Sequence, residues 1–196
     1  MSAKLISIIG PPAAGKTTLA ETLAQLLPAK LIREDYAGNP FLAESYVGDE
    51  RTRLPGQLYF LLSRAGQLAA GRMPEAGAVV SDYGFCQDRL YAQLRLASDD
   101  LKIYEKIASR VEAVVHRPDM LICLDASADS LLDRIADRGR VHESALTAGL
   151  LENMRREYDK LSAELGCPAI RVDTDGVDIR DSANCRRIVE QVRSRI

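Results

Sequence analysis

The sequence has no excess of charge of either sign, no long hydrophobic run and no cysteines paired in a C-x-x-C motif. Its 26 basic and 28 acidic residues give a net charge of −2, so nucleic acid and anionic membranes are poor candidates as partners. No stretch approaches the roughly 20 apolar residues of a membrane-spanning helix, and residues 1–10 lack the layout of a signal peptide. Four isolated cysteines are typical of a reducing compartment, and we expect a cytoplasmic protein.

The chain does contain a regular alternation of short apolar runs and helical segments. Its 196 residues, 46% of them hydrophobic, are enough for one domain with a sizeable core. Strands are expected at Lys4–Ile9, Leu31–Ile32, Ala78–Ser81, Met120–Leu124 and Ile170–Val172. Helices are expected at Lys16–Leu27, Phe41–Tyr46, Gln57–Leu68, Asp88–Leu96, Leu101–Val115, Ser130–Ala136, Leu146–Leu165 and Asp181–Arg195. This alternation predicts a single α/β domain, residues 1–196, with a five-stranded parallel sheet covered by helices on both faces.

A phosphate-binding loop follows the first expected strand. The segment from Gly10 to Thr17 matches the pattern G-x-x-x-x-G-K-[ST], and an amphipathic helix follows it. Glycines let successive backbone N–H groups turn toward phosphate oxygens, while the helix N-terminus adds a positive dipole end. We expect Lys16 to reach the β- and γ-phosphates of ATP and the Thr17 hydroxyl to hold Mg²⁺. The residues expected to bind the nucleotide are Gly10, Pro11, Pro12, Ala13, Ala14, Gly15, Lys16, Thr17 and Thr18.

The pattern leaves open which carboxylate would help to bind magnesium. His116 and His142 are far apart and form no metal-binding pattern, so an ordinary surface or packing role is expected for each. Two apolar strands are each followed directly by an aspartate, namely Asp82 and Asp125. Either aspartate could face the metal beside the loop. A strand-end aspartate also commonly caps the next helix.

An arginine cluster follows the fourth expected strand. Arg134 and Arg138 are four residues apart and share a helix face, and Arg140 comes after Gly139, which we expect to end the helix. Three guanidinium groups converging near a triphosphate would stabilise charge on a transferring phosphoryl group. In a chain with a phosphate loop, we interpret them as catalytic residues on a lid.

With these motifs in place, the sequence resembles the deoxynucleoside kinase family, which is related to the thymidylate kinases. The resemblance runs from Lys4 to about Tyr158, and its marks are short segments in a shared order. They are Gly10–Thr18, Glu34 with Asn39–Leu42, Gln57–Arg64, Ser81–Asp88, Pro118–Met120 with Leu124-Asp125, and Arg134-x-x-x-Arg138-Gly139-Arg140-x-x-Glu143. The fold implied is a single P-loop kinase domain with an arginine-bearing lid, assembled as a homodimer packed through helices.

The resemblance implies a role for each matching residue around a nucleoside substrate. Glu34 would be the general base that takes the proton of the 5′-hydroxyl. Gln57 would make paired hydrogen bonds to the base edge, because its amide offers a donor beside an acceptor, and Asp88 would help to read the base. Tyr46 and Glu143 would together hold the 3′-hydroxyl of the sugar.

On the donor side, the resemblance favours Asp82 over Asp125 as the carboxylate associated with magnesium. Arg134, Arg138 and Arg140 match the family lid that closes over the phosphates. The loop Asp173–Val177 would hold the adenine of ATP.

One position departs from the family pattern. An arginine commonly follows the carboxylate at the end of the third strand, where it would contact phosphate and the 5′-oxygen region, but this chain has Tyr83. Arg33, beside Glu34, is a candidate replacement, although strand alternation points it to the opposite face.

Three functions are therefore considered. The first is ATP-dependent phosphorylation of the 5′-hydroxyl of a deoxynucleoside, with Mg²⁺, for nucleoside salvage. The second is a monophosphate kinase of the thymidylate kinase type, which would need extra cations for the acceptor phosphate, with Arg51, Arg53 and Arg64 available. The third is a nucleotide-binding regulatory protein with weak or no transfer, for which Tyr83 is the main support.

Overall fold

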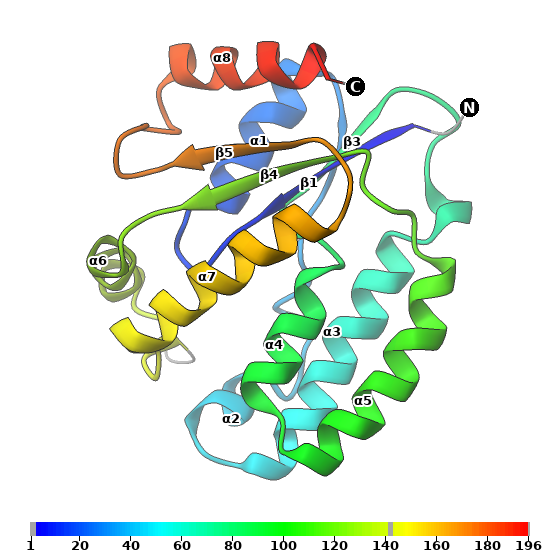
Figure 1. The fold of residues 1–196 in the computed structure, drawn as a ribbon, viewed down its shortest axis with the longest axis vertical. Coiled ribbons are helices and arrows are strands. Elements are labelled where there is room, and N and C mark those ends of the chain that lie inside the picture. The colour runs from blue at the N-terminus through cyan, green and yellow to red at the C-terminus, as the bar shows by residue number, and fades with distance from the viewer. Residues whose placement is uncertain (1–2, 141–142, 196) are drawn as a thin grey trace.

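Five parallel strands form the centre of the protein, whose structure is a computed structural model describing residues 3–140 and 143–195 (Figure 1). The strands are β1 (Lys4–Ile9), β2 (Lys30–Ile32), β3 (Ala78–Ser81), β4 (Met120–Asp125) and β5 (Ala169–Asp173). Their order in the sheet is β2-β3-β1-β4-β5, and every neighbouring pair is parallel. The predicted five-stranded parallel sheet is confirmed. His142 lies outside the described residues.

Helices cover both faces of this sheet, as predicted (Figure 1). On one face lie α1 (Lys16–Leu26) and α8 (Ser182–Arg193), and on the other lies α7 (Ala148–Glu164) with a layer of α3 (Arg53–Gln67), α4 (Gln87–Arg95) and α5 (Ser98–Val111). The remaining α-helices among the described residues are α2 (Leu42–Val47) and α6 (Ala128–Arg138). Short 3₁₀ turns occupy Glu50–Thr52, Ala70–Arg72 and Glu112–Val114. None of the helices described is long and apolar enough to cross a membrane.

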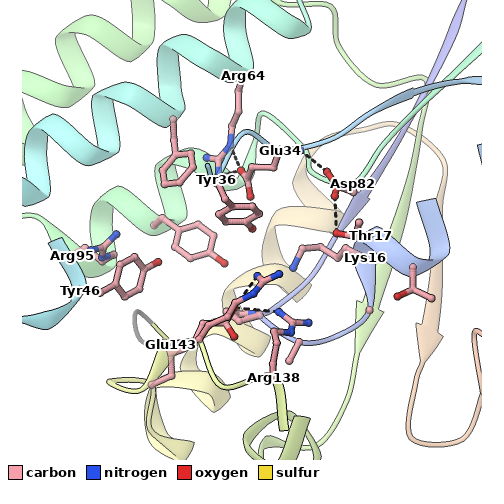
Figure 2. A pocket seen from close by; sticks show the side chains of 18 of the residues that line it. Lys16, Thr17, Glu34, Tyr36, Tyr46, Arg64, Asp82, Arg95, Arg138 and Glu143 are labelled. Atoms are coloured by element: carbon pink, nitrogen blue, oxygen red, sulfur yellow. Dashed lines mark hydrogen bonds and ion pairs between the residues drawn. The ribbon is translucent and has the colours of Figure 1, made fainter. Parts of the chain in front are cut away.

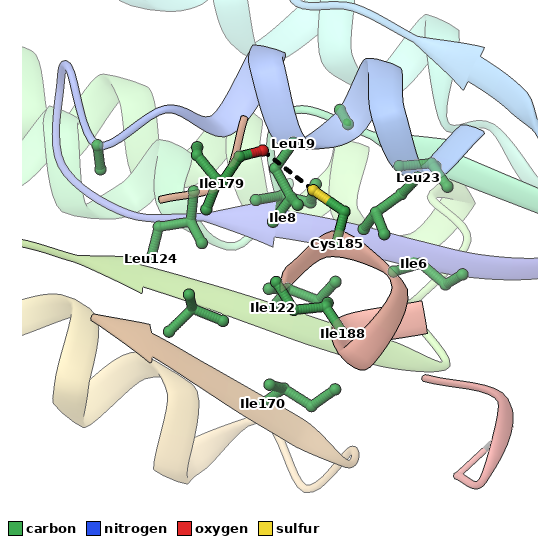
Figure 3. Packing of buried hydrophobic residues seen from close by; sticks show 14 of the residues in the cluster. Ile6, Ile8, Leu19, Leu23, Ile122, Leu124, Ile170, Ile179, Cys185 and Ile188 are labelled. Carbon is green, nitrogen blue, oxygen red and sulfur yellow. Dashed lines mark hydrogen bonds between the residues drawn. The ribbon is translucent and has the colours of Figure 1, made fainter. Parts of the chain in front are cut away.

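The central strand β1 is apolar on both faces because each face meets a helix layer. Ile6 and Ile8 are fully buried and pack with Leu19 and Leu23 of α1 (Figure 3). Ile9 points to the other face and packs against α7 residues instead. Strand alternation thus explains why the sequence shows a continuous apolar run there.

Two helices, α3 and α5, begin three or more residues earlier than the sequence predicts. The expected helix Gln57–Leu68 begins at Arg53, because Pro55 lies in its first turn, where a missing N–H costs nothing. The expected break at 98–100 is instead the first turn of α5, in which Asp99 and Asp100 complement the helix dipole. The same helix ends at Val111 and continues as a 3₁₀ turn, short of the predicted Val115.

The carboxyl ends of all five strands meet at one edge of the sheet, which is where ligands bind in open parallel sheets. The segments after β1, β2 and β3 carry Lys16, Glu34 and Asp82, so chain positions far apart in sequence converge there.

Candidate functional site

The phosphate loop links β1 to α1 and has a backbone that only glycine can supply at its start. Gly10 has φ +148°, and a Cβ placed there would lie 2.4 Å from the backbone oxygen of Leu124. Gly15 has φ +94° and immediately precedes α1. The predicted loop residues therefore form a cradle at the N-terminus of a helix, which suits a phosphate group.

Lys16 lies in the same pocket and curls over its own loop. Its Nζ donates to the backbone oxygens of Gly10 and Pro11, each at 2.8 Å. Burial lowers the pKa of Lys16 to about 8, against the opposing effect of the Glu34 and Asp82 carboxylates. The ammonium group thus depends on nearby negative charge, and phosphate oxygens would supply more of it.

Thr17 and Asp82 stand together at the edge of the pocket (Figure 2). The Thr17 hydroxyl donates to Asp82 Oδ2 at 2.7 Å, and Asp82 Oδ1 accepts from the backbone N–H of Glu34 at 2.8 Å. Burial raises the pKa of Asp82, and these hydrogen bonds oppose the rise. One carboxylate beside a hydroxyl is an oxygen donor set that fits Mg²⁺, which completes its shell with water and phosphate oxygens.

Asp125, the other candidate, is paired with an arginine of α7. Both its oxygens accept from Arg155 of α7, at 2.7 and 2.9 Å, and it does not line the pocket. This ion pair joins β4 to α7, so the geometry favours Asp82 as the metal-facing carboxylate.

Glu34 lies beside Asp82 in the wall of the pocket and is 9% exposed (Figure 2). Its Oε1 accepts from both Nε and Nη2 of Arg64, a buried arginine of α3, with the Nε bond at 2.5 Å. Arg64 Nη1 donates to Asp88 Oδ1. Burial alone lowers the pKa of Arg64, but the two carboxylates outweigh it and raise the pKa above its usual value. The guanidinium group therefore stays charged between two acids.

Gln57 and Asp88 are hydrogen-bonded to one another, and Asp88 also binds Arg64. Gln57 Nε2 donates to the backbone oxygen of Asp88 at 3.1 Å and to its Oδ1 at 2.9 Å. Asp88 Oδ2 accepts from the Tyr104 hydroxyl at 2.7 Å. Gln57 lines the pocket but Asp88 does not, so Asp88 acts on the pocket through Gln57 and Arg64. Both donor hydrogens of Gln57 are engaged, which leaves its oxygen as the atom offered to a ligand.

The predicted sugar-binding pair lines the pocket from two different elements. Tyr46 comes from α2, and the guanidinium of Arg95 in α4 lies 3.7 Å from its ring centre. Arg95 Nη2 also donates to the backbone oxygen of Ser45 at 2.8 Å, which ties α2 to α4. Glu143 is buried, and its Oε2 accepts no hydrogen bond from the residues described. A buried carboxylate oxygen without a donor suits a ligand hydroxyl.

The three lid arginines divide into two groups. Arg138 and Arg140 line the pocket, where each donates to Glu143 Oε1, at 3.1 and 3.5 Å. Arg134 does not line it, and donates instead to Thr174 Oγ1 and the Thr174 backbone oxygen, at 2.8 and 2.9 Å. Arg134 thus holds the loop Asp173–Val177 against α6.

Neither Tyr83 nor Arg33 brings a positive charge to the pocket. Tyr83 is fully buried in a cluster with Leu5 and Ile32, and its hydroxyl donates to Gln67 Oε1 at 2.5 Å. Arg33 is exposed and binds Glu21, so the predicted opposite orientation of Arg33 and Glu34 is confirmed.

Some pocket residues were missed or misjudged from the sequence. Arg64 was considered only as a cation for an acceptor phosphate, and its link to Glu34 joins elements 30 positions apart. Tyr91 and Arg95 also line the pocket. Their spacing from Asp88 along α4, at three and seven residues, was a signal that could have found them.

Together these residues can bind a polyphosphate at one end and a polar ligand with hydroxyl groups at the other. Lys16, Arg138 and Arg140 supply positive charge, while Glu34 presents a carboxylate to the space between the two ends. This arrangement suits transfer of a phosphoryl group to a hydroxyl.

Comparisons with known proteins agree with this reading. A sequence model of the family described as "Deoxynucleoside kinase" matches residues 6–196. Deoxyguanosine kinase of Bacillus subtilis (strain 168) is 28% identical over 204 residues, spanning 100% of this chain and 99% of that protein. Deoxyadenosine/deoxycytidine kinase of the same organism is 30% identical over 206 residues, spanning 97% and 92%. The solved structure of M. mycoides deoxyadenosine kinase, with dCMP and dCDP bound, has the same fold, with a TM-score of 0.82 at 22% identity over 97% of this chain and 98% of that one.

Proposed function

Because the chain belongs to the deoxynucleoside kinase family and is a kinase, we propose that it transfers the γ-phosphoryl group of ATP to the 5′-hydroxyl of a deoxynucleoside. The observation that carries the proposal is that Lys16 of the phosphate loop and the buried Glu34 carboxylate face the same pocket. A phosphate donor and a hydroxyl acceptor could therefore meet between them.

The phosphate loop is the proposed site of the ATP phosphates. Lys16 and the backbone N–H groups of the loop would bind the β- and γ-phosphates, and Arg138 and Arg140 would bind the transferring group. Thr17 and Asp82 would hold Mg²⁺, which supplies positive charge that offsets the charge of the triphosphate. Arg134 would contribute to the proposed lid indirectly, because it binds the loop Asp173–Val177, which would hold the adenine.

The deoxynucleoside would occupy the other end of the pocket. The oxygen of the 5′-hydroxyl would attack the γ-phosphorus in line with the leaving oxygen of ADP, and Glu34 would accept the proton of that hydroxyl. Gln57 would bind the base edge, fixed in orientation by Asp88. Glu143 and Tyr46 would bind the 3′-hydroxyl, which is supported by the buried Glu143 Oε2 that accepts no hydrogen bond from the described residues.

A nucleoside fits this pocket better than a nucleoside monophosphate. The side chain of Arg51 is 90% exposed and binds Asp49, while Arg53 binds Glu50. Arg64 is already shared by two carboxylates. None of these three arginines offers the uncompensated positive charge that an acceptor phosphate needs.

The proposal extends to the state of the protein in the cell. We propose that residues 1–196 act as one kinase domain, in a cytoplasmic homodimer that takes part in nucleoside salvage and binds neither nucleic acid nor membranes. All four cysteines lie in the described part of the chain as free thiols, which supports a reducing compartment.

The direct test incubates the purified protein with Mg-ATP and one acceptor at a time. The acceptors are the four deoxynucleosides and, separately, their 5′-monophosphates, and the product is resolved by chromatography. Turnover of one or more deoxynucleosides, with none of the monophosphates, is expected. Transfer to monophosphates alone would identify a monophosphate kinase, and tight ATP binding without transfer to either class would favour a regulatory protein.

A further inference from the structure

The ion-pair cluster of Glu34, Arg64 and Asp88 is the feature of this pocket that the resemblance to the family did not predict. The side chain of Arg64 is 5% exposed, and those of Glu34 and Asp88 are 2% and 1% exposed. One guanidinium thus joins the carboxylate beside the proposed reacting centre to the carboxylate behind the base-edge amide of Gln57.

Each nitrogen of the Arg64 guanidinium has a specific carboxylate partner within the cluster. Nε and Nη2 of Arg64 both bind Oε1 of Glu34, while Nη1 binds Oδ1 of Asp88. Oε2 of Glu34 is not used by Arg64. The planar guanidinium therefore fixes the orientation of the Glu34 carboxylate by binding one of its oxygens twice.

Two aromatic rings hold Arg64 in place. Its guanidinium carbon lies 5.1 Å from the ring centre of Phe60 and 5.8 Å from that of Tyr83. Tyr83 occupies the position where an arginine is common in the family, and its hydroxyl is bound to Gln67. Position 83 therefore brings no cation to Glu34, and the cation beside Glu34 comes from α3, with the Tyr83 ring packed next to it.

We propose that Arg64 is a positioning residue that orients Glu34 for proton removal and couples this orientation to the base-reading pair Gln57 and Asp88. The proposal rests on the proposed deoxynucleoside kinase function. A fitting base stabilises the positions of the Gln57 and Asp88 side chains. Because Arg64 binds both Asp88 and Glu34, it then stabilises the orientation of the Glu34 carboxylate as well. A base that displaces Gln57 lowers kcat as well as affinity.

The test replaces Arg64 by methionine, which keeps an unbranched apolar stem and removes the charge. For the best deoxynucleoside, R64M is expected to lower kcat at least about 100-fold, because two buried carboxylates lose their shared partner. The ratio of kcat between the best and the poorest deoxynucleoside is expected to shrink at least about fivefold. The Kd of ATP, whose proposed site is the phosphate loop, is expected to stay within about twofold.

Matched variants separate positioning from folding. Arg33→Met removes the arginine next to Glu34 in sequence that faces away from it, and wild-type kcat is expected. Adding Tyr83→Arg to R64M restores a guanidinium to the cluster and is expected to recover kcat at least about tenfold. Should R64M not fold, Arg64→Lys keeps the charge without the forked geometry and is expected to lower kcat about tenfold with the ATP Kd unchanged.

The outcomes are distinct. Folded R64M with kcat within about threefold of wild type and an unchanged base preference would overturn the inference while leaving the kinase intact. Equal losses on all four deoxynucleosides together with a weakened ATP Kd would also overturn it, because they indicate general damage. No turnover by the wild-type protein on any deoxynucleoside would overturn the proposed function, and the inference with it.

Discussion

Single side chains in this pocket are held by partners that come from other elements. Asp82 illustrates this, because one oxygen binds the hydroxyl of Thr17 and the other binds the backbone of Glu34. A carboxylate at the end of β3 thereby links the phosphate loop to the segment after β2. Asp82 and Asp125 are both aspartates, so their surroundings are what distinguish them.

The two aspartates make a matched test of the proposed metal site. Asp82→Asn is expected to raise the Mg²⁺ concentration needed for half-maximal turnover by about 10-fold or more, because a neutral amide is a weaker ligand for a hard cation. Asp125→Asn should leave that concentration unchanged, since Asp125 binds Arg155 outside the pocket. Turnover measured across a magnesium titration gives the answer. An equal response from both variants, or none from Asp82→Asn, would count against the site.

The sequence could not choose between these aspartates by pattern, because both follow apolar strands. The choice depends on Arg155, which lies 30 positions after Asp125 and reaches it only when α7 packs on β4. The phosphate loop, in contrast, follows a sequence pattern, because its glycines and the start of α1 can be identified from neighbouring residues. Arg64 shows the other extreme, since its two carboxylate partners lie 30 and 24 positions away.

At the scale of elements, α6 presents its arginines to two different places. Arg134 and Arg138 are four residues apart, which corresponds to about 6 Å along the helix. Arg138 lines the pocket, while Arg134 holds Thr174 in the segment after β5. The sequence correctly placed both on one helix, but how α6 lies along the pocket rim depends on packing with α7 that periodicity does not encode.

This division predicts different kinetic effects from two substitutions on one helix. Arg138→Gln is expected to lower kcat about 100-fold, as loss of a group that stabilises transferring charge does. Arg134→Gln is expected to act mainly on the KM of ATP, raising it about tenfold, because the Asp173–Val177 loop loses its contacts with α6. Steady-state kinetics with ATP varied at saturating deoxynucleoside measures both. The same change in kcat and KM from the two variants would contradict the division.

On the scale of the whole molecule, the parallel sheet and its helix layers followed from the alternation of strands and helices. The two helix starts that differed most, at Arg53 and Ser98, lie where proline or aspartate can either break a helix or begin one. The helix layer farthest from the sheet also has exposed apolar side chains, namely Leu62 in α3, Ile103 in α5 and Val114 just after α5. Exposed apolar side chains on adjacent elements are candidates for a contact with another protein.

The proposed homodimer is consistent with this surface. Light scattering is expected to give twice the 21.5 kDa mass of the chain at micromolar concentration. Ile103→Glu, which adds a charge to the exposed surface of α5, is expected to lower that mass if the dimer packs through this helix. A wild-type mass of 21.5 kDa would contradict the homodimer and leave the pocket, which is built within one chain, unaffected.

The most direct test of the central claim is turnover of the preferred deoxynucleoside by Glu34→Gln, compared with Asp35→Asn. Asp35 is the neighbouring carboxylate, which accepts from Tyr59 and the backbone of Gly38 and does not line the pocket. Glu34→Gln is expected to lower kcat by about 10²- to 10⁴-fold with ATP binding intact, because the amide cannot take the proton of the 5′-hydroxyl. Asp35→Asn is expected to retain wild-type turnover. Full turnover by Glu34→Gln would contradict the account, because the carboxylate at the centre of the pocket would then have no part in the reaction.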